Sequence, residues 1–437
     1  MQWLSSSEPD FERKFARLVG ERRESDSGVT GAVADIIAEV RARGDAAVAE
    51  YTQRFDKHPL HSESDWRIGP EACAAAFAAL DTPLREALEL AAARIRAYHA
   101  DQVPQDRDST DSAGVRLGAK WRAVDAAGLY VPGGRAAYPS SLLMNAIPAK
   151  VAGVERLVVT TPTPGGAVNP LVLAAAHVAG VGEIWRIGGA QAIAALAYGT
   201  ARIRPVDVIT GPGNAYVAEA KRQLYGVVGI DMVAGPSEIL VVADNRNDPE
   251  WIAADLLSQA EHDPLAQSIL ITDDAGFAQQ VADRLDVQCA QLATEKSARA
   301  SWETHGTVIV VDDLAEAPAL ANRLAAEHVE LAVEDPEALF ARLHHAGSVF
   351  LGRHTPEAVG DYVAGPNHVL PTGRRARFAS GLSVLDFMKR TSFISLDAGA
   401  LAAIGPAAIE LARAEGLPAH AKSVELRLSA QLKGARA

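Results

Sequence analysis

Residues 256–264 read Leu-Leu-Ser-Gln-Ala-Glu-His-Asp-Pro and close an apolar run typical of a helix. Gln259 and His262 are three residues apart, so their side chains project from one helix face. An amide oxygen beside an imidazole nitrogen can form half of a metal site whose other ligands come from distant sequence. Because Gln is an uncommon ligand, the pair alone is better explained as a solvated helix end whose His lies near the negative end of the helix dipole.

Histidines concentrate in the second half of the chain, where acid–base or metal chemistry is therefore expected. Glu327 and His328 are adjacent at the transition from an expected helix (317–326) to an expected strand (329–333). Such a pair can divide water activation from proton transfer, and it can equally be a solvated turn. Eight of the twelve histidines follow residue 250, namely His262, His305, His328, His344, His345, His354, His368 and His420.

Together with Gln259 and His262, Asp361 and His420 would provide four N and O ligands, a set suited to zinc or manganese. The cysteines are not expected to take part. Both lie in alanine-rich helical stretches without another Cys or a His at ligand spacing. The pattern indicates buried thiols in a reducing compartment.

Glycine-rich loops follow three expected strands, at residues 128–134, 188–191 and 211–216. Loops at the carboxyl ends of parallel strands bind ligands, and glycine lets the backbone approach a phosphate at a helix N-terminus. A nucleotide is the natural candidate, although the dinucleotide fingerprint is incomplete because Tyr216 replaces its third glycine. Asp231 is placed either to bind a ribose or to end a strand, and tight turns alone also explain these loops.

The elements that must position these residues are strands alternating with helices. Helices are expected within 29–55 and 70–99, a polar linker at 101–114, and a loop-rich region at 354–393 before a helical C-terminal segment. Between them, short β-branched segments alternating with helices predict parallel βαβ units with right-handed crossovers. The expected strands form two series, 127–131, 156–161, 183–187 and 206–210, then 239–243, 268–272, 307–311, 329–333 and 348–351.

Composition narrows the function. The 437 residues, 48% apolar and 22% charged, are typical of a globular protein of several domains. The formal charge of −13 argues against nucleic acid or an anionic membrane as the main partner. No secretion signal or membrane span is recognisable, so we expect a soluble, cytoplasmic protein.

Six blocks of the sequence, taken in order, resemble the histidinol dehydrogenase family over about residues 30–430. They are Gly-Pro-Gly-Asn-Ala-Tyr-Val (211–217), Asp-Met-Val-Ala-Gly-Pro-Ser-Glu (231–238), Leu-Leu-Ser-Gln-Ala-Glu-His-Asp (256–263), Gly-Pro-Asn-His-Val-Leu-Pro-Thr (365–372), Ser-Gly-Leu-Ser-Val-Leu-Asp-Phe (380–387) and Glu-Gly-Leu-Pro-Ala-His-Ala (415–421).

The resemblance implies an NAD-dependent, four-electron oxidation of L-histidinol to L-histidine through bound L-histidinaldehyde, the last steps of histidine biosynthesis. It implies that Glu327 activates water and that His328 is the general acid–base. The implied cofactor contacts are Tyr130, Gln191 and Asn214. One Zn²⁺ per subunit would be held by Gln259, His262, Asp361 and His420. The implied substrate contacts are Ser237, Gln259, His262, His328, Asp361, His368, Glu415 and His420.

The resemblance also implies a homodimer in which Glu415 and His420 complete the partner subunit's site. The expected fold is α/β, with two doubly wound, incomplete Rossmann-like units. The expected domains are a helical N-terminal region packing on the second α/β unit (1–110), a cofactor-side unit (111–236), a unit with the metal and catalytic residues (237–380), and a small helical dimerisation segment (381–437).

Two other functions stay open. A related zinc- and NAD-dependent dehydrogenase could oxidise another small polar alcohol, such as a sulfonated diol, with the same catalytic pair. A metal-dependent binding protein that has lost catalysis is the alternative from a different class. The intact Glu327-His328 pair argues against the second alternative, and NADH formation would decide between them.

Overall fold

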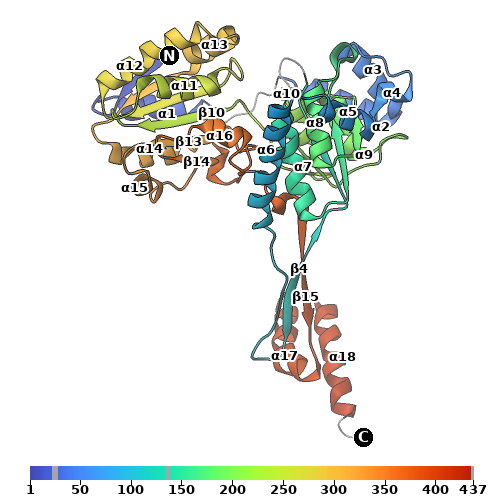
Figure 1. The fold of residues 1–437 in the computed structure, drawn as a ribbon. Coiled ribbons are helices and arrows are strands. Elements are labelled where there is room, and N and C mark those ends of the chain that lie inside the picture. Colours follow the sequence, from blue (N-terminus) through green and yellow to red (C-terminus); the bar gives the residue numbers. More distant parts are fainter. Residues whose placement is uncertain (22–27, 134–137, 435–437) are drawn as a thin grey trace. The chain divides into compact units, whose positions relative to one another are not determined.

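The computed structural model describes residues 1–21, 28–133 and 138–434 (Figure 1). They form two compact units. The main unit comprises residues 1–102 and 124–387, and the C-terminal unit comprises 103–123 and the residues from Met388 onward. Among the described residues, no helix combines the length and apolar character needed to cross a membrane.

The first sheet of the main unit has six strands in the order β2-β7-β6-β5-β8-β9. All neighbouring strands are parallel except β2, which runs antiparallel to β7 at one edge. The central strands are short and apolar because helices cover both faces of a parallel sheet. Their bounds are β2 (Arg67–Ile68), β5 (Ala126–Tyr130), β6 (Arg156–Thr160), β7 (Glu183–Trp185), β8 (Val208–Thr210) and β9 (Gly229–Ile230).

Two groups of helices accompany this sheet. The first group shares a buried core with the strands and comprises α2 (Thr30–Arg43), α3 (Asp45–Asp56), α9 (Gly189–Tyr198) and α10 (Ala215–Leu224). The helices of the second group pack on one another, and α7 also lies against β5. They are α5 (Pro70–Ala78), α6 (Thr82–Ala100), α7 (Pro139–Ala152) and α8 (Pro170–Ala179), and a short α4 (Glu63–Trp66) precedes β2.

The second sheet is parallel throughout, in the order β1-β12-β11-β10-β13-β14. Every residue of β10, β11 and β13 is buried, which explains their nearly continuous apolar sequences. The bounds are β1 (Gln2–Ser5), β10 (Glu238–Ala243), β11 (Gln267–Thr272), β12 (Thr307–Val310), β13 (His328–Ala332) and β14 (Ser348–Leu351).

Helices cover both faces of the second sheet (Figure 1). One face carries α11 (Pro249–Ala260), α12 (Ala275–Cys289) and α13 (Glu295–His305). The other face carries α1 (Phe11–Gly20), α14 (Ala317–Leu324) and α15 (Pro336–Phe340). A short helix, α16 (Glu357–Tyr362), follows β14.

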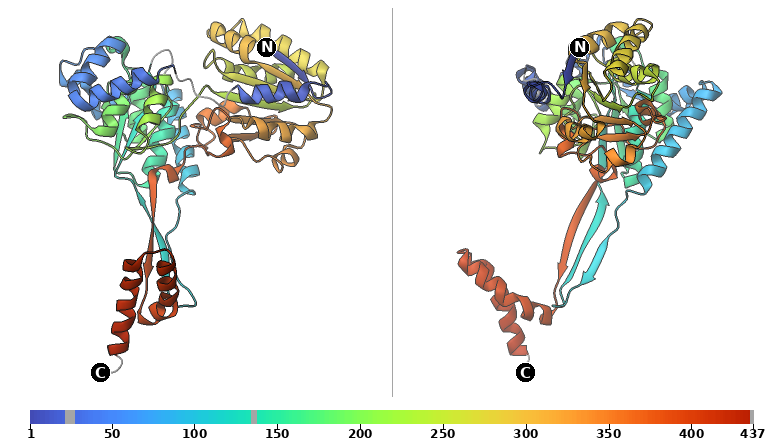
Figure 2. Two further views of the ribbon diagram at one scale, coloured as in Figure 1. Left: turned by 180° about the vertical axis from the view of Figure 1, so that it is seen from behind. Right: turned by 90° about the vertical axis from the view of Figure 1, so that its left-hand side faces the viewer.

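The C-terminal unit is a three-stranded antiparallel sheet followed by two helices, which Figure 2 shows from two further sides. Its strands are β3 (Arg107–Thr110), β4 (Arg116–Ala123) and β15 (Met388–Ser395). The helices α17 (Ala398–Ala414) and α18 (Pro418–Gly434) pack against each other.

The predicted α/β class is confirmed, and all nine predicted strands are present. The predicted packing of the N-terminal region differs from the structure. Only β1 and α1 lie on the second sheet, whereas β2 pairs with the first sheet and α2 and α3 lie in its core. The predicted linker 101–114 contains β3, which pairs with β4. The remaining domain boundaries stay predictions.

Candidate active site

Glu327 and His328 lie at the amino end of β13. Helix α14 ends at Leu324, and Ala325 adopts a left-handed conformation (φ 44°) that turns the chain into the strand. In the sheet His328 is in register with Ile239 of β10, so the amino ends of these two strands are neighbours. Both side chains are buried, with exposed fractions of 6% for Glu327 and 4% for His328. The predicted solvated turn is therefore excluded for this pair.

The backbone of Glu238, the first residue of β10, contacts both side chains. Its N–H donates to Glu327 Oε2 (2.9 Å), and its carbonyl oxygen lies 3.3 Å from His328 Nδ1. Since a carbonyl can only accept, Nδ1 carries the ring proton and Nε2 carries the lone pair. One residue thus fixes the carboxyl of Glu327 and the tautomer of His328.

Burial moves the pKa values of the two groups in opposite directions, because it disfavours the charged form of each. It raises the pKa of Glu327 well above its ordinary value and lowers the pKa of His328 to about 4. Near neutral pH, His328 is therefore an uncharged base. Burial favours the protonated carboxyl of Glu327, and a nearby positive charge would favour the carboxylate by lowering its pKa.

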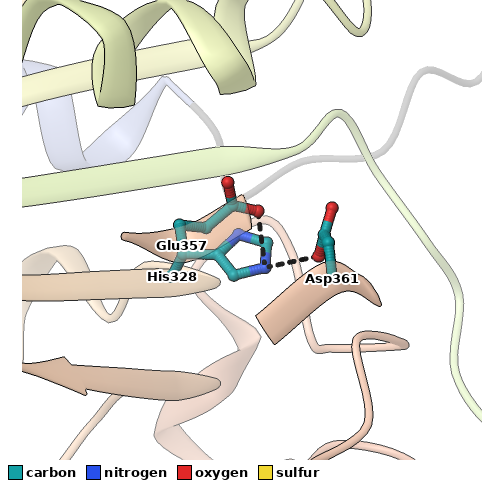
Figure 3. A group of neighbouring side chains, drawn as sticks. All are labelled: His328, Glu357 and Asp361. Carbon is teal, nitrogen blue, oxygen red and sulfur yellow. Dashed lines mark ion pairs between the residues drawn. The ribbon is translucent and has the colours of Figure 1, made fainter. Parts of the chain in front are cut away.

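His328 Nε2 faces two carboxyl groups of α16, as Figure 3 shows. It lies 3.7 Å from Glu357 Oε1 and 3.9 Å from Asp361 Oδ1. Glu357 and Asp361 are four residues apart and so share one face of the helix. The sequence analysis singled out Asp361 and missed Glu357, although this spacing was a signal that could have found it.

Glu357 belongs to a buried group of carboxyls behind His328. Ser258 Oγ donates to Glu357 Oε2 (3.1 Å), and Asp255 interacts with Glu330 of β13. Burial raises the pKa of Glu357 to about 8 and that of Glu330 to about 9. Near neutral pH these two groups are mostly protonated, so they add little negative charge to the site.

Gln259, His262 and Asp361 offer the donors that the sequence suggested for a metal. Gln259 lies in the last turn of α11 and is fully buried, and its Oε1 has no hydrogen-bond partner among the described residues. Its Nε2 lies 3.1 Å from His262 Nδ1. Helices α11 and α16 are in contact, and Ser258, next to Gln259, donates to Glu357, one turn before Asp361. An orphaned amide oxygen beside an imidazole and a carboxylate fits a divalent metal.

A second set of possible ligands consists of His328, Glu357 and Asp361, whose ligand atoms lie within 4.8 Å of one another. The two sets share Asp361. Each set contains a buried atom without a hydrogen-bond partner among the described residues, and we favour the first set because it matches the four-ligand prediction.

The expected substrate contacts Ser237 and His368 also lie in the main unit. Ser237 immediately precedes β10 and is half-buried. His368 Nδ1 lies 3.0 Å from the backbone oxygen of Asp361, and its Nε2 lies 3.5 Å from Ser141 Oγ. Glu415 and His420 are exposed residues of the C-terminal unit, the first at the C-cap of α17 and the second in α18.

Tyr130 and Gln191 lie at the carboxyl edge of the first sheet. Tyr130 ends β5, and its hydroxyl accepts a hydrogen bond from the N–H of Gly189 (3.1 Å), at the start of α9. Burial raises the pKa of Tyr130 to about 12, so the hydroxyl stays protonated. Gln191 in the first turn of α9 is buried, and its Oε1 has no hydrogen-bond partner among the described residues. Gly134, the last residue of the predicted glycine-rich loop 128–134, lies outside the described residues.

Asn214 follows β8 and caps α10. Its Oδ1 accepts from the N–H groups of Tyr216 (3.1 Å) and Val217 (3.2 Å). The preceding Gly211 has a φ of 112°, and a Cβ there would lie 2.2 Å from the carbonyl oxygen of Tyr130, so only glycine fits. The loops that follow β5, β7 and β8 thus meet at one edge, as the sequence predicted.

Asp231 has a structural role in this loop. Its carboxylate accepts from the N–H of Gly211 (2.8 Å) and forms a buried ion pair with Lys221. Lys221 Nζ also donates to the Gly211 carbonyl (2.9 Å). The possible role of Asp231 as a ribose ligand is therefore not supported, because its oxygens already hold the turn together.

A sequence model described as "Histidinol dehydrogenase" matches residues 20–428. Histidinol dehydrogenase of Zymomonas mobilis is 63% identical over 426 residues, which cover 98% of this chain and 99% of that protein. The protein of the same name from Ruegeria pomeroyi is 63% identical over 427 residues, covering 98% of each chain.

Among solved structures, histidinol dehydrogenase from Elizabethkingia anophelis superimposes with a TM-score of 0.92 at 36% identity, covering 99% of this chain and 98% of that one. The similarity therefore extends over nearly the whole chain. The chain belongs to the histidinol dehydrogenase family and is an oxidoreductase.

Proposed function

We propose that this chain oxidises L-histidinol to L-histidine through bound L-histidinaldehyde, with NAD as the electron acceptor, in the last steps of histidine biosynthesis. The observation that carries the proposal is the buried Glu327-His328 pair. The backbone of a single residue, Glu238, contacts both side chains, and the candidate metal ligands Gln259, His262 and Asp361 lie in the same unit. A four-electron oxidation needs both an acid–base group and a water-activating group in one enclosed site.

In the first oxidation His328 takes the hydroxyl proton on Nε2, the nitrogen that bears the lone pair. In the second, Glu327 takes a proton from the water that adds to the aldehyde carbon, while His328 returns its proton to the carbonyl oxygen, giving a hydrate and a neutral imidazole. His328 then takes a hydroxyl proton from that hydrate as the carboxylic acid forms. The positive charge of an oxidised nicotinamide near Glu327 would lower its pKa and prepare it as a base.

NAD, when bound, accepts one hydride from the alcohol and a second from the hydrated aldehyde. We assign its contacts to Tyr130, Gln191 and Asn214. The unpartnered Gln191 Oε1 supports this assignment, since it leaves a buried polar atom available at the carboxyl edge of the sheet.

We assign one Zn²⁺ per subunit to Gln259, His262, Asp361 and His420. When bound, the metal would hold the amine and imidazole of the substrate between the two oxidations, a role in positioning. Ser237, His368 and Glu415 are assigned to the substrate as well, and His328 contacts it through the transferred proton.

We further propose a homodimer in which Glu415 and His420 act in the partner subunit's site. Their exposure in the C-terminal unit supports this, as do exposed apolar side chains on its helices, such as Leu411 (65% exposed) and Leu426 (57%). Two buried free cysteines, Cys73 and Cys289, are consistent with a cytoplasmic location.

The test is NADH formation by the purified chain with L-histidinol, before and after a chelator removes metal, with a sulfonated diol as the competing substrate. Activity with L-histidinol that is lost on chelation and restored by zinc supports the proposal. Oxidation of the diol alone would favour the related alcohol dehydrogenase, and no NADH with either would favour a binding protein. Membership of the family favours histidinol.

A further inference from the structure

Arg374 is a fully buried cation next to the catalytic pair. Its exposed fraction is 0%, and its Nη1 lies 3.2 Å from Oε1 of Glu238, which is 1% exposed. Its backbone is left-handed (φ 65°), a conformation that costs free energy for a residue other than glycine. Removing two charges from water is also costly, so a buried ion pair is poor evidence of stabilisation and better evidence of a specific role.

Two further contacts of Arg374 help to tie together the amino ends of two strands. Its Nη2 donates to Oε1 of Gln267 (2.7 Å) and lies 3.4 Å from the carbonyl oxygen of Leu18. Gln267 begins β11 and is in register with Glu238 of β10. Its backbone N–H also donates to the carbonyl of Ser237 (2.9 Å), so Arg374 is bonded to both sides of this strand pair.

The neighbours of Arg374 fasten the segment that leads into β10. Oγ1 of Thr372 accepts from the N–H of Gly235 (2.6 Å). Nη1 of Arg375 donates to the carbonyl of Val233 (2.6 Å). Residues 372–375 therefore hold residues 233–238 along their length, and Arg374 provides the innermost attachment.

Glu238 is the residue whose backbone N–H binds Glu327 and whose carbonyl binds His328. A shift of the Glu238 backbone would move both catalytic groups at once. A misplacement of about 1 Å can cost about 10²-fold in rate, because the reacting groups must meet at short distance.

We propose that Arg374 is a positioning residue for the Glu327-His328 pair, acting through its ion pair with Glu238 and its hydrogen bond to Gln267. The proposal rests on the proposed function, because it assumes that this pair performs the chemistry. It adds a residue outside the expected catalytic, metal, cofactor and substrate sets.

The test compares Arg374→Gln, which loses the charge, with Arg374→Lys, which keeps it. We expect kcat for aldehyde oxidation to fall about 10²-fold in Arg374→Gln, with KM for L-histidinol and for NAD within about threefold of wild type. Arg374→Lys should recover part of the lost kcat. Rescue by the conservative variant separates positioning from a merely structural role.

Two control variants accompany these. Arg246→Lys also replaces an arginine by lysine, but in an exposed ion pair with Glu334, and should leave kcat unchanged. Arg246 and Glu334 follow the carboxyl ends of β10 and β13. Leu285→Ala removes a fully buried side chain of α12 and should lower the thermal midpoint without a selective loss of kcat. If Arg374→Gln does not fold, the kcat of Arg374→Lys is compared with the kcat of Leu285→Ala at equal thermal midpoint. A kcat of Arg374→Lys equal to that of Leu285→Ala and of wild type overturns the proposal.

A crystal structure of the folded variant provides a readout that does not depend on activity. We expect the backbone of Glu238 and the carboxyl of Glu327 to shift, and an unmoved carboxyl would contradict the proposal. Wild-type protein that does not oxidise L-histidinol would refute the proposed function and leave the structural readout to judge Arg374. Active wild type with unchanged kcat in Arg374→Gln would refute only the role of Arg374.

Discussion

Glu327 and His328 are adjacent, buried to a similar extent and held by the same residue, yet the physical effect of burial on them is opposite. The carboxyl is pushed toward its neutral, protonated form and the imidazole toward its neutral, basic form. His328 is thus ready to accept a proton near neutral pH, whereas a nearby positive charge would help Glu327 to act as a base. This difference suits a reaction in which an alcohol is deprotonated first and water is activated later.

Replacing Glu327 by Gln should separate the two oxidations. The alcohol step needs only His328, so its rate should stay within about tenfold of wild type, while the aldehyde step should fall about 10²- to 10⁴-fold. The rates are measured with L-histidinol and with L-histidinaldehyde supplied separately. Equal losses in both steps would count against a water-activating Glu327.

Replacing His262 by Asn should remove the metal. The buried Gln259 Oε1 would lose the partner that a bound metal provides, and metal affinity should fall by more than about 100-fold, with loss of turnover. Bound zinc is measured by atomic absorption, with His344→Asn as the control because His344 is exposed on another part of the main unit. Full zinc content and full activity in His262→Asn would refute the metal assignment.

At the residue scale, the sequence pointed to Glu327, His328 and Asp361 through residue type, spacing and family resemblance. It could not identify Glu238 or Arg374 as partners of the pair. The contact of Glu238 is made by its backbone, which any residue possesses. The contact of Arg374 joins positions 136 residues apart whose proximity depends on the fold.

At the scale of elements, the second sheet carries its chemistry at an unusual edge. Parallel α/β sheets bind ligands at the carboxyl ends of their strands, as the loops with Tyr130, Gln191 and Asn214 do in the first sheet. Glu238 and His328, in contrast, begin β10 and β13. The backbone N–H of Glu238, the first residue of β10, is the group that binds Glu327.

Glu330 of β13 should make stability depend on pH. Burial raises its folded-state pKa to about 9, so between its unfolded-state pKa and pH 9 the folded chain binds the extra proton. The free energy of unfolding therefore falls as pH rises, by up to about 1.4 kcal/mol per pH unit from this group.

Glu330→Gln keeps the hydrogen-bonding shape and cannot ionise, so its free energy of unfolding should fall less steeply between pH 5 and pH 9. Urea denaturation at several pH values measures the slopes. Glu334→Gln, at an exposed position, is the matched control and should behave like wild type. Equal slopes for Glu330→Gln and wild type would show that Glu330 does not hold a proton in the folded chain.

The sequence predicted the buried central strands because their apolar runs alternate with amphipathic helices. It did not predict β1, β2, β3, β4, β9 or β15. Two of these strands have only two residues, and β15 is mostly polar and exposed, so neither length nor periodicity distinguishes them from loops. Pairing with distant strands defines them, and that information is not local.

At the scale of the whole molecule, the proposal places Glu327 and His420 of one site on different subunits. A symmetric dimer makes this testable, because each inactive variant then carries the residue that the other lacks. Glu327→Gln and His420→Asn should each lack aldehyde oxidation, which is the activity measured here. A randomly re-associated equal mixture should recover about a quarter of wild-type activity, since half the dimers are mixed and each restores one site.

The mixture is prepared by denaturing and refolding both variants together, and the control mixes each variant with itself. No recovery in a mixture shown by mass spectrometry to contain mixed dimers would mean that Glu327 and His420 of one subunit serve the same site. Family resemblance suggested this arrangement, and composition or periodicity could not have done so.

The most direct test of the central claim is the amount of NADH formed per L-histidinol consumed by purified wild-type chain with excess NAD, together with identification of the product. The account predicts two NADH per L-histidinol and L-histidine as the product, because both hydrides leave the same bound molecule. One NADH with released aldehyde, or none, would contradict it.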